Sequence, residues 1–308
     1  MTNAHLYVIH ALSPLHAGTG QGTGVIDLPI AREKATGIPY LAGSSVKGVL
    51  RDSNKLGLSE EDQSLFFGPS FKKDNERPED NAGAAIFSDA RLLLFPVRSL
   101  RGTFAWVTSP YILNRFAREV KEVQSLGNIL PKEALPNWED RQAIWVAEPK
   151  HLTLQKPKTT EQWVVLEDLD LKYQDSLLAK EWLNALKKIL DEEEICRLLD
   201  KHFAIVHDDV MNFLLRNATE IVARIRLNPE AKTVEQGALW YEESLPAESL
   251  LTGVITAQSV KQRKENGDSY TAKQVSERLS SLQPQIMQFG GKATVGRGLC
   301  RFSLVGGK

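Results

Sequence analysis

Two glycine-rich segments lie near opposite ends of this chain, and each adjoins a short segment of β-forming residues. The first, 18–24, has glycine at every second position and follows the β-type segment 5–12 after a Ser-Pro step. The second, 290–298, precedes the apolar segment 299–305. Glycine lets a backbone or a ligand approach closely and tolerates conformations that other residues avoid. The sequence therefore predicts a fold with a strand near each end of the chain, each joined to a glycine-rich loop that a ligand or another backbone segment can approach closely.

Between these loops, β-type and helical segments alternate without a clear internal repeat. This pattern predicts an α+β fold with an antiparallel sheet and helices on one face, and it is compatible with a ferredoxin-like core enlarged by insertions. One expected helix begins at Ser44 or Ser45 and ends at Gly57, and a second follows a Ser109 cap with Pro110 at its first position. Further helical segments are expected over much of 176–218 and over 269–289. The expected strands include 84–97, 219–228, 237–244 and 249–259, and an extended, basic-tipped hairpin is expected to project from the body within 145–168.

Composition bounds the kind of protein. The chain has 308 residues, 42% of them hydrophobic, with 38 Lys plus Arg against 39 Asp plus Glu. A net charge of −1 argues against a free-standing protein that binds nucleic acid by bulk electrostatics, so a polyanion site must be a local patch. Cys196 and Cys300 stand alone, which indicates neither a zinc site nor a disulfide framework. The start lacks a signal peptide and no segment suits a membrane span, so we expect a cytoplasmic protein without a membrane partner.

The segment GSSVKG (43–48) is a candidate anion site. It lacks the spacing of a P-loop, and 18–24 does not open a helix as a dinucleotide fingerprint would. A helix that begins at Ser44 and Ser45 would aim backbone amides at an anion, and Lys47 and Arg51 are one helical turn apart. The alternative is an ordinary helix start with solvated basic residues.

The second glycine loop places Lys292 and Arg297 among small residues, including Gly290 and Gly291. Such a loop would let an RNA backbone approach its amides and cations. The alternative is that these glycines only permit tight packing between secondary-structure elements.

His16 and Asp27 are the candidate catalytic pair beside the first glycine loop. The chain has no HExxH motif, no defensible Ser-His-Asp order and no spaced carboxylate pair. An ionised Asp27 is a weak base, so holding a divalent metal is the easier role for it. The alternative is that Asp27 caps a turn while His16 makes a loop hydrogen bond.

With these segments in order, the chain resembles the RAMP superfamily of CRISPR-associated proteins, and more narrowly the backbone subunits of type III-B (Cmr) effector complexes. The resemblance rests on the first loop with Asp27, LAGSSVKGVLRD (41–52), 224–255 and GGKATVGRGLCRF (290–302). It implies one RAMP domain, 1–308, with a modified RNA-recognition-motif core. The palm core would comprise 1–127 and 220–308, the thumb hairpin 145–168 and a helical insertion 175–218.

The resemblance also implies partners and chemistry. The partners would be a CRISPR guide RNA, a target RNA, other Cmr subunits and further copies of the chain in a helical filament. In such proteins the loop aspartate after the first strand carries cleavage, so Asp27 would cut the target endonucleolytically at regular intervals. From the residues themselves, we expect His16 and a divalent ion, Mg²⁺ or Mn²⁺, to complete this site. A scaffold without catalysis, or a guide-processing nuclease, are the alternatives, and the sequence assigns no role to Glu242 and Glu243. The RNA contacts would come from Gly18, Gly20, Ser44, Ser45, Lys47, Arg51, Lys156, Lys158, Gly290, Gly291, Lys292 and Arg297.

Overall fold

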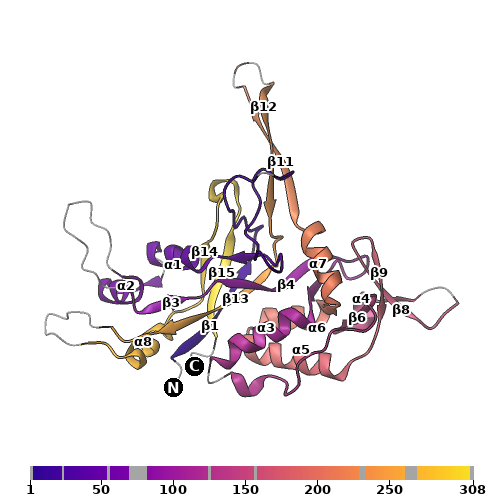
Figure 1. Ribbon diagram of the computed structural model, residues 1–308, viewed down its shortest axis with the longest axis horizontal. Coiled ribbons are helices and arrows are strands. Elements are labelled where there is room, and N and C mark those ends of the chain that lie inside the picture. Colours follow the sequence, from indigo (N-terminus) through magenta and orange to yellow (C-terminus); the bar gives the residue numbers. More distant parts are fainter. Residues whose placement is uncertain are drawn as a thin grey trace.

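The computed structural model describes residues 3–22, 24–53, 56–68, 82–123, 126–155, 158–228, 230, 233–260 and 269–305. Its strands are β1 (Ala4–Ala11), β2 (Tyr40–Leu41), β3 (Ala85–Phe87), β4 (Ala90–Arg98), β5 (Phe104–Thr108), β6 (Ala143–Val146), β7 (Leu154–Gln155), β8 (Gln162–Leu166), β9 (Leu169–Tyr173), β10 (Phe203–Val206), β11 (Glu220–Leu227), β12 (Val234–Ser244), β13 (Leu250–Ala257), β14 (Gln285–Gln288) and β15 (Leu299–Val305). Thirteen of these described strands form one sheet in the order β14-β15-β1-β13-β4-β5-β10-β6-β9-β8-β7, with β2 beside β4 and β3 beside β13. Figure 1 shows how this sheet and the helices are arranged.

The helices are α1 (Gly43–Asp52), α2 (Glu60–Phe67), α3 (Pro110–Lys121), α4 (Pro149–Leu152), α5 (Leu177–Leu190), α6 (Glu193–His202), α7 (Asp208–Asn217) and α8 (Ala272–Leu279), with short 3₁₀ turns η2 (Gly127–Ile129) and η3 (Ala293–Val295). Within the described residues, none of these helices is long and apolar enough to cross a membrane.

The centre of the sheet is a β-α-β-β-α-β unit. Along the chain its elements are β1, α1, β4, β13, α8 and β15, and in the sheet its strands lie in the order β15-β1-β13-β4 with every neighbouring pair antiparallel. This is the order of a ferredoxin-like fold, so the predicted fold class is confirmed. Seven of the eight residues of β1 are buried, as expected for a strand covered on both faces.

Helices cover both faces of this unit, so the expectation of helices on one face is wrong. His5 of β1 contacts α8, because its Nε2 lies 2.8 Å from Ser276 Oγ. The preceding residue, Ala4, instead lines a cavity of about 750 Å³ together with Tyr111 and Glu119 of α3. Successive strand residues point to opposite faces, so α8 and α3 lie on opposite sides of the sheet.

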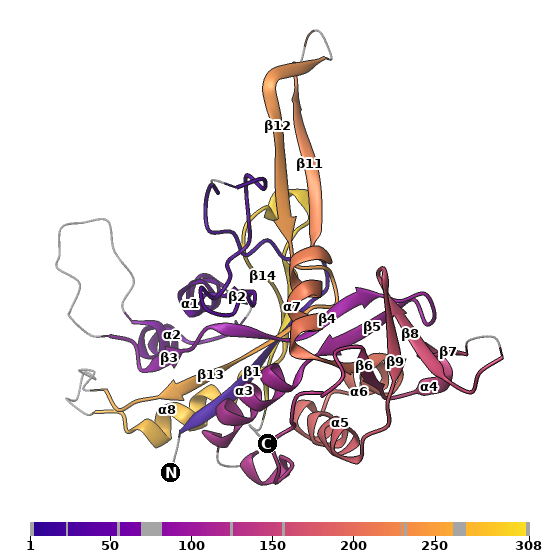
Figure 2. The same cartoon turned by 45° about the vertical axis from the view of Figure 1, so that its right-hand side comes forward.

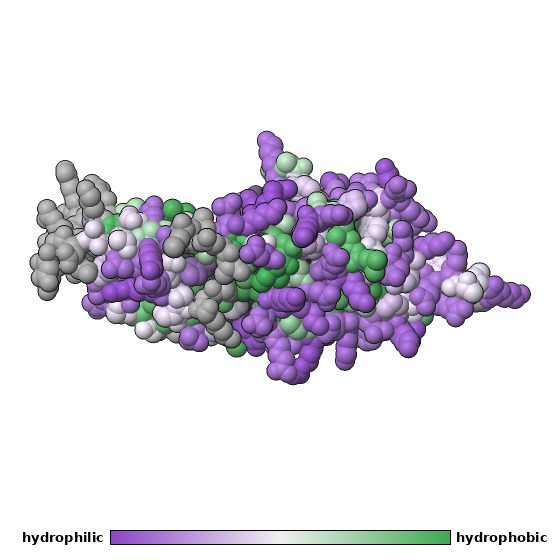
Figure 3. All heavy atoms as spheres, turned by 90° about the horizontal axis from the view of Figure 1, so that it is seen from below, coloured by the Kyte–Doolittle hydropathy of each residue, from purple (hydrophilic) through white to green (hydrophobic). Residues whose placement is uncertain are grey.

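Polar side chains cover most of the surface seen from below, with apolar patches between them (Figure 3).

The long insertion between β4 and β13 extends the sheet and ends in a hairpin that leaves it. The elements from β5 to β10 continue the sheet, with parallel pairs at β5–β10 and β6–β9. The strands β11 and β12 form a separate two-stranded sheet that projects from the body (Figure 2). The segment 145–168, predicted to hold the projecting hairpin, runs from the end of β6 to β8, and β7 and β8 pair there as a short hairpin at the outer edge of the main sheet.

Two predicted helices have different limits in the structure. Helix α1 begins at Gly43 after Ala42, without a side-chain cap, and ends at Asp52, so Ser44, Ser45 and Gly57 do not bound it. The predicted helix 269–289 stops at Leu279, and 285–288 form β14. The helix after Ser109 begins with Pro110 as predicted. The strand predicted over 84–97 is divided into β3 and β4.

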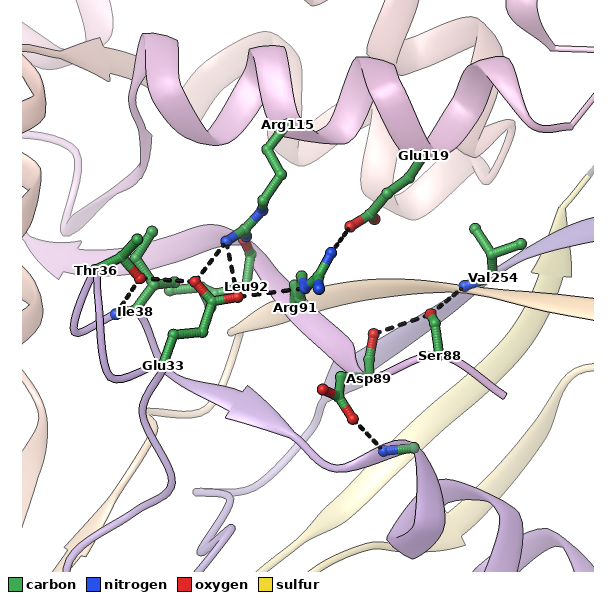
Figure 4. A network of polar contacts seen from close by, with 11 residues as sticks. Glu33, Thr36, Ile38, Ser88, Asp89, Arg91, Leu92, Arg115, Glu119 and Val254 are labelled. Atoms are coloured by element: carbon green, nitrogen blue, oxygen red, sulfur yellow. Dashed lines mark hydrogen bonds and ion pairs between the residues drawn. The ribbon is translucent and has the colours of Figure 1, made fainter. Parts of the chain in front are cut away.

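A polar network fixes the segment that follows Ile30 against the body (Figure 4). The Glu33 carboxylate lies 3.4 Å from the Arg115 guanidinium of α3 and 3.3 Å from Arg91 Nε of β4. Arg91 NH1 also donates to Glu119 Oε1 (2.7 Å), and the buried Arg115 donates to the backbone oxygen of Leu92 (3.0 Å). Segment, helix and strand are thereby tied together by charged groups that satisfy one another.

The turn that leads into β15 generates a stability prediction. Gly298 and Gly296 have nearly the same positive φ, +77° and +78°. A Cβ at Gly298 would lie 1.9 Å from the backbone oxygen of Phe289, whereas one at Gly296 would meet nothing within 4 Å. We expect Gly296→Ala to lower the free energy of unfolding by about 1–2 kcal/mol, the cost of a left-handed alanine, and Gly298→Ala to lower it clearly more. Urea unfolding of both variants measures this, and equal losses would contradict it.

Candidate functional site

The loop 18–30 carries Asp27 beside the base of the projecting hairpin. The loop pairs with itself, because Gly22 N donates to Asp27 O (2.8 Å) and Gly18 bridges to Ile30. It also runs along β12, where Leu28 N donates to Tyr241 O (3.0 Å). The Asp27 side chain is exposed, and its Oδ2 accepts a hydrogen bond from Tyr241 N (2.8 Å). The apolar neighbours in GVIDLPI therefore do not bury this carboxylate.

His16, the second predicted catalytic residue, is buried rather than placed in an open loop. Only 6% of it is exposed, and its Nδ1 donates to the backbone oxygen of Glu243 (2.6 Å). That bond fixes a proton on Nδ1 and the orientation of the ring. No hydrogen bond joins His16 to Asp27 among the residues that the structure describes, so the two do not form a directly bonded pair.

Both glycine loops pack around His16. A Cβ at Gly18 would lie 2.5 Å from His16 Nε2, and one at Gly290 would lie 2.4 Å from the His16 backbone oxygen. Gly291 N donates to that same oxygen (2.9 Å). Close packing, the alternative reading of the second loop, therefore accounts for Gly290, and it also accounts for Gly18.

Glu243, to which the sequence assigned no role, joins the loop to the hairpin. It is 3% exposed, its Oε2 accepts from Ile30 N (3.1 Å) and its Oε1 accepts from Arg32 NH2 (2.6 Å). Its backbone N donates to Leu28 O (3.0 Å). Strand alternation could not reveal this residue, since Glu242 and Glu243 are both buried although they point to opposite faces of β12.

The Glu242 carboxylate pairs with two cations at the base of the hairpin. Its Oε1 accepts from Lys292 Nζ and from Trp240 Nε1, both at 2.8 Å, and Arg224 Nε lies 3.3 Å from Oε2. Burial would raise the pKa of Glu242, but these donors and positive charges outweigh it and hold that pKa at about 2. Glu242 is therefore an anion that anchors Lys292 to the hairpin.

Arg297, like Lys292, is paired with a carboxylate of the hairpin. Its NH1 donates to Glu220 Oε2 (2.8 Å). The two cations predicted to bind RNA from the second glycine loop thus brace β11 and β12 against the body, and their charges are largely compensated within the protein.

A cavity of about 840 Å³ brings the two glycine loops together with α1. Its lining includes Gly18, Ser45, Gly290 and Gly291, which the sequence placed in separate candidate sites. Helical spacing puts Ser45, Val49 and Asp52 on the face of α1 toward this cavity.

Lys47 and Arg51 lie on another face of α1. Lys47 Nζ donates to Ala85 O (3.4 Å), and Arg51 Nε lies 3.3 Å from Asp52 Oδ1. Burial, and then the charge of Arg51, lower the pKa of Lys47. At the start of α1, Gly43 N already donates to the Asp89 carboxylate (2.8 Å), so one amide expected to hold a phosphate is occupied by the protein itself.

The remaining predicted positions are peripheral or outside the described residues. Gly20 is exposed with φ +95°, and Ser44 is exposed on α1. Lys158 is exposed at the edge of the main sheet with φ +64°, and Lys156 lies outside the described residues. Among the described residues, no group of three or more His, Cys, Asp or Glu side chains could hold a metal ion, so the predicted metal position rests on Asp27 alone.

Comparison with known proteins fits this arrangement. A family model of the RAMP superfamily matches residues 8–301. The CRISPR system Cmr endoribonuclease Cmr4 of Pyrococcus furiosus is 36% identical over 303 residues, which cover 98% of this chain and 95% of that protein. The CRISPR system CMR subunit Cmr4 of Saccharolobus solfataricus is 24% identical over 95% of this chain and 94% of its own length.

Solved structures agree at the level of the fold. The crystal structure of oligomeric Cmr4 from Pyrococcus furiosus superposes with a TM-score of 0.70 at 28% identity, over 98% of this chain and 97% of that one. A chain in the cryo-EM structure of the type III-B Cmr-beta complex bound to cognate target RNA gives 0.69 at 22% identity, over 98% and 96%. From the length of the match and the identity to the Pyrococcus protein, this chain belongs to the RAMP superfamily and, within it, to the Cmr4 family.

Proposed function

We propose that this chain is the guide-RNA-binding backbone subunit of a type III-B CRISPR effector complex and that it cleaves bound target RNA at regular intervals. The observation that carries this proposal is an exposed Asp27, held beside a projecting hairpin, in a chain 36% identical over its length to a protein named an endoribonuclease. Its partners would be guide RNA, target RNA, other Cmr subunits and further copies of itself, in the cytoplasm.

The cleavage chemistry needs little from the protein. The 2′-hydroxyl of RNA can attack the adjacent phosphate in line and displace the 5′-oxygen, which leaves a cyclic phosphate. The protein then supplies geometry, charge compensation and a proton acceptor. Asp27 is exposed and ionisable, whereas His16 is enclosed by both glycine loops and hydrogen-bonded through Nδ1. We therefore assign proton transfer or metal binding to Asp27, and to His16 the positioning of the loops.

A divalent ion can bind at Asp27 only if RNA phosphates and water supply the rest of the ion's coordination shell. Mg²⁺ is commonly held by one or two carboxylates together with substrate phosphates and water. Asp27 offers one carboxylate, whose Oδ2 is already hydrogen-bonded to Tyr241 N, and no hydrogen bond or ion pair among the described residues engages Oδ1. When bound, the ion would stabilise charge on the reacting phosphate.

We further propose that β11 and β12, rather than 145–168, contact the guide–target duplex and expose the phosphate to be cut. This hairpin is a separate two-stranded sheet that projects from the body, and its strand β12 makes the hydrogen bonds to Asp27 and Leu28. An element that distorts the duplex there would present the distorted phosphate directly to Asp27.

Replacement of Asp27 by asparagine tests the nuclease proposal. Asp27→Asn keeps the size of the side chain and an oxygen that can accept from Tyr241 N, but removes the charge. Single-turnover cleavage of a labelled target by the reconstituted complex should fall by at least about two orders of magnitude, while guide and target binding persist. Full activity would leave the chain as a scaffold without catalysis, and cleavage of unprocessed repeat RNA by the isolated chain would favour a guide-processing nuclease.

Removal of divalent ions tests the metal proposal separately. With a chelator, cleavage by the wild-type complex should be lost and should return when Mg²⁺ or Mn²⁺ is added, while complex assembly, followed by native gel, stays unchanged. Undiminished cleavage in chelator would instead identify Asp27 as a proton acceptor that needs no metal.

The salt dependence of guide-RNA affinity distinguishes cations that contact RNA phosphates from cations that are paired with carboxylates of the protein. Lys47 has no carboxylate partner among the described residues, so Lys47→Gln should reduce the slope of log affinity against log salt by about one unit. The double variant Arg297→Gln with Glu220→Gln removes a neutral pair and should leave the slope unchanged. Filter binding over a salt series measures both slopes, and the reverse pattern would move the phosphate contact from α1 to the second glycine loop.

A further inference from the structure

Arg32 connects three parts of the molecule through one guanidinium group. Its NH2 donates to Glu243 Oε1 (2.6 Å) and to the backbone oxygen of Leu215 (2.9 Å), and its NH1 donates to the backbone oxygen of Gly37 (3.0 Å). Leu215 lies in the last turn of α7, where backbone carbonyls lack partners within the helix. Arg32 therefore joins β12, the end of α7 and the segment after the Asp27 loop.

The two sides of the hairpin base, the residue before β11 and the strand β12, meet at the Glu243 carboxylate that Arg32 binds. Glu243 lies in β12, and its Oε1 also accepts from Thr219 Oγ1 (2.9 Å), directly before β11. Its Oε2 accepts from Ile30 N, at the end of the Asp27 loop. Among the described residues, Arg32 is the cation paired with this buried carboxylate. The loop and the hairpin, already joined by backbone hydrogen bonds at Leu28, thus form one unit.

The residue next to Arg32 faces the opposite way. Glu33 binds Arg115 of α3 and Arg91 of β4, as Figure 4 shows. Adjacent residues of one segment therefore hold the hairpin unit on one side and the sheet and α3 on the other. A planar guanidinium with several donors suits this task, because one ammonium group could not align with a carboxylate and two carbonyl groups at fixed positions.

We propose that Arg32 is a positioning residue that fixes the hairpin and the Asp27 loop, as one unit, against the body of the protein. This positioning would place Asp27 beside one particular phosphate of the target RNA in each of the regular cleavage intervals. This inference rests on the proposed function for its consequence in cleavage, but its geometric part, the fixed orientation of the hairpin, does not depend on catalysis.

The geometric part is tested by a distance measurement on the free chain. Spin labels at Leu239→Cys on β12 and Leu177→Cys at the start of α5, both exposed positions, are introduced with Cys196 replaced by serine. The wild-type background should give one narrow distance distribution. Arg32→Ala and Arg32→Lys should broaden it, with Lys intermediate because it keeps the charge for Glu243 but not the forked donors. Unchanged distributions in Arg32→Lys, which is the variant better able to fold, would overturn the proposal.

The functional part is tested by mapping cut positions in the reconstituted complex. Arg32→Lys should lower the single-turnover rate about tenfold or more, since a small misplacement of reacting groups is costly, and should spread cuts to neighbouring phosphates while guide affinity stays unchanged. Arg301→Ala, which removes a guanidinium bound to Glu192 and Glu194 away from the site, is the matched control and should keep the wild-type pattern.

The outcomes separate the two proposals. A wild-type complex that fails to cleave contradicts the nuclease function but leaves the distance measurement to decide the role of Arg32. A slower Arg32→Lys complex with unchanged cut positions and a narrow distance distribution would overturn the positioning role while the nuclease function stands.

Discussion

The buried Glu243 is the point on which the site depends. Its carboxylate receives Arg32, Thr219 and Ile30, and its backbone receives the ring of His16. A buried carboxylate is costly unless its partners satisfy it, and removing one partner leaves an uncompensated charge. The elements that supply these partners are far apart in sequence. Their convergence therefore specifies one arrangement of loop, hairpin and helix end, which a purely apolar contact would define less sharply.

Much of the fold follows from local signals, and the parts that do not are set by distant partners. The strand at 5–12 was predictable from propensity, and the helix start after Ser109 was predictable from Pro110 at its first position, although Ser109 makes no side-chain capping hydrogen bond. The segment 285–288 looked helical, yet Pro284 precedes it and it pairs with β15. The resemblance assigned 220–308 to the palm core, whereas β11 lies in a hairpin outside the main sheet, on which Ile221 and Ile225 are about half exposed. Such burial depends on neighbours that the sequence does not reveal.

The candidate site shows the same division. Sequence patterns found the two glycine loops and α1, and the structure brings them together around one cavity. They could not show that the Asp27 side chain is exposed while His16 is buried, because both residues have apolar neighbours in sequence. Nor could they show that Lys292 and Arg297 are paired with Glu242 and Glu220, since these pairs join segments separated by 50 and 77 residues.

The pairing of these cations has a consequence for how RNA affinity would arise. In a chain with a net charge of −1, Lys292 and Arg297 are compensated internally, so the second glycine loop offers little free positive charge to a phosphate backbone. Affinity in a filament would then be the sum of weak sites on successive copies, since each bound copy raises the effective concentration of the next site. Weak attraction also means that RNA contributes little to ordering Asp27, whose negative charge phosphates repel. The loop must be ordered beforehand, and the hydrogen bonds from Tyr241 and Glu243 hold it in place without RNA.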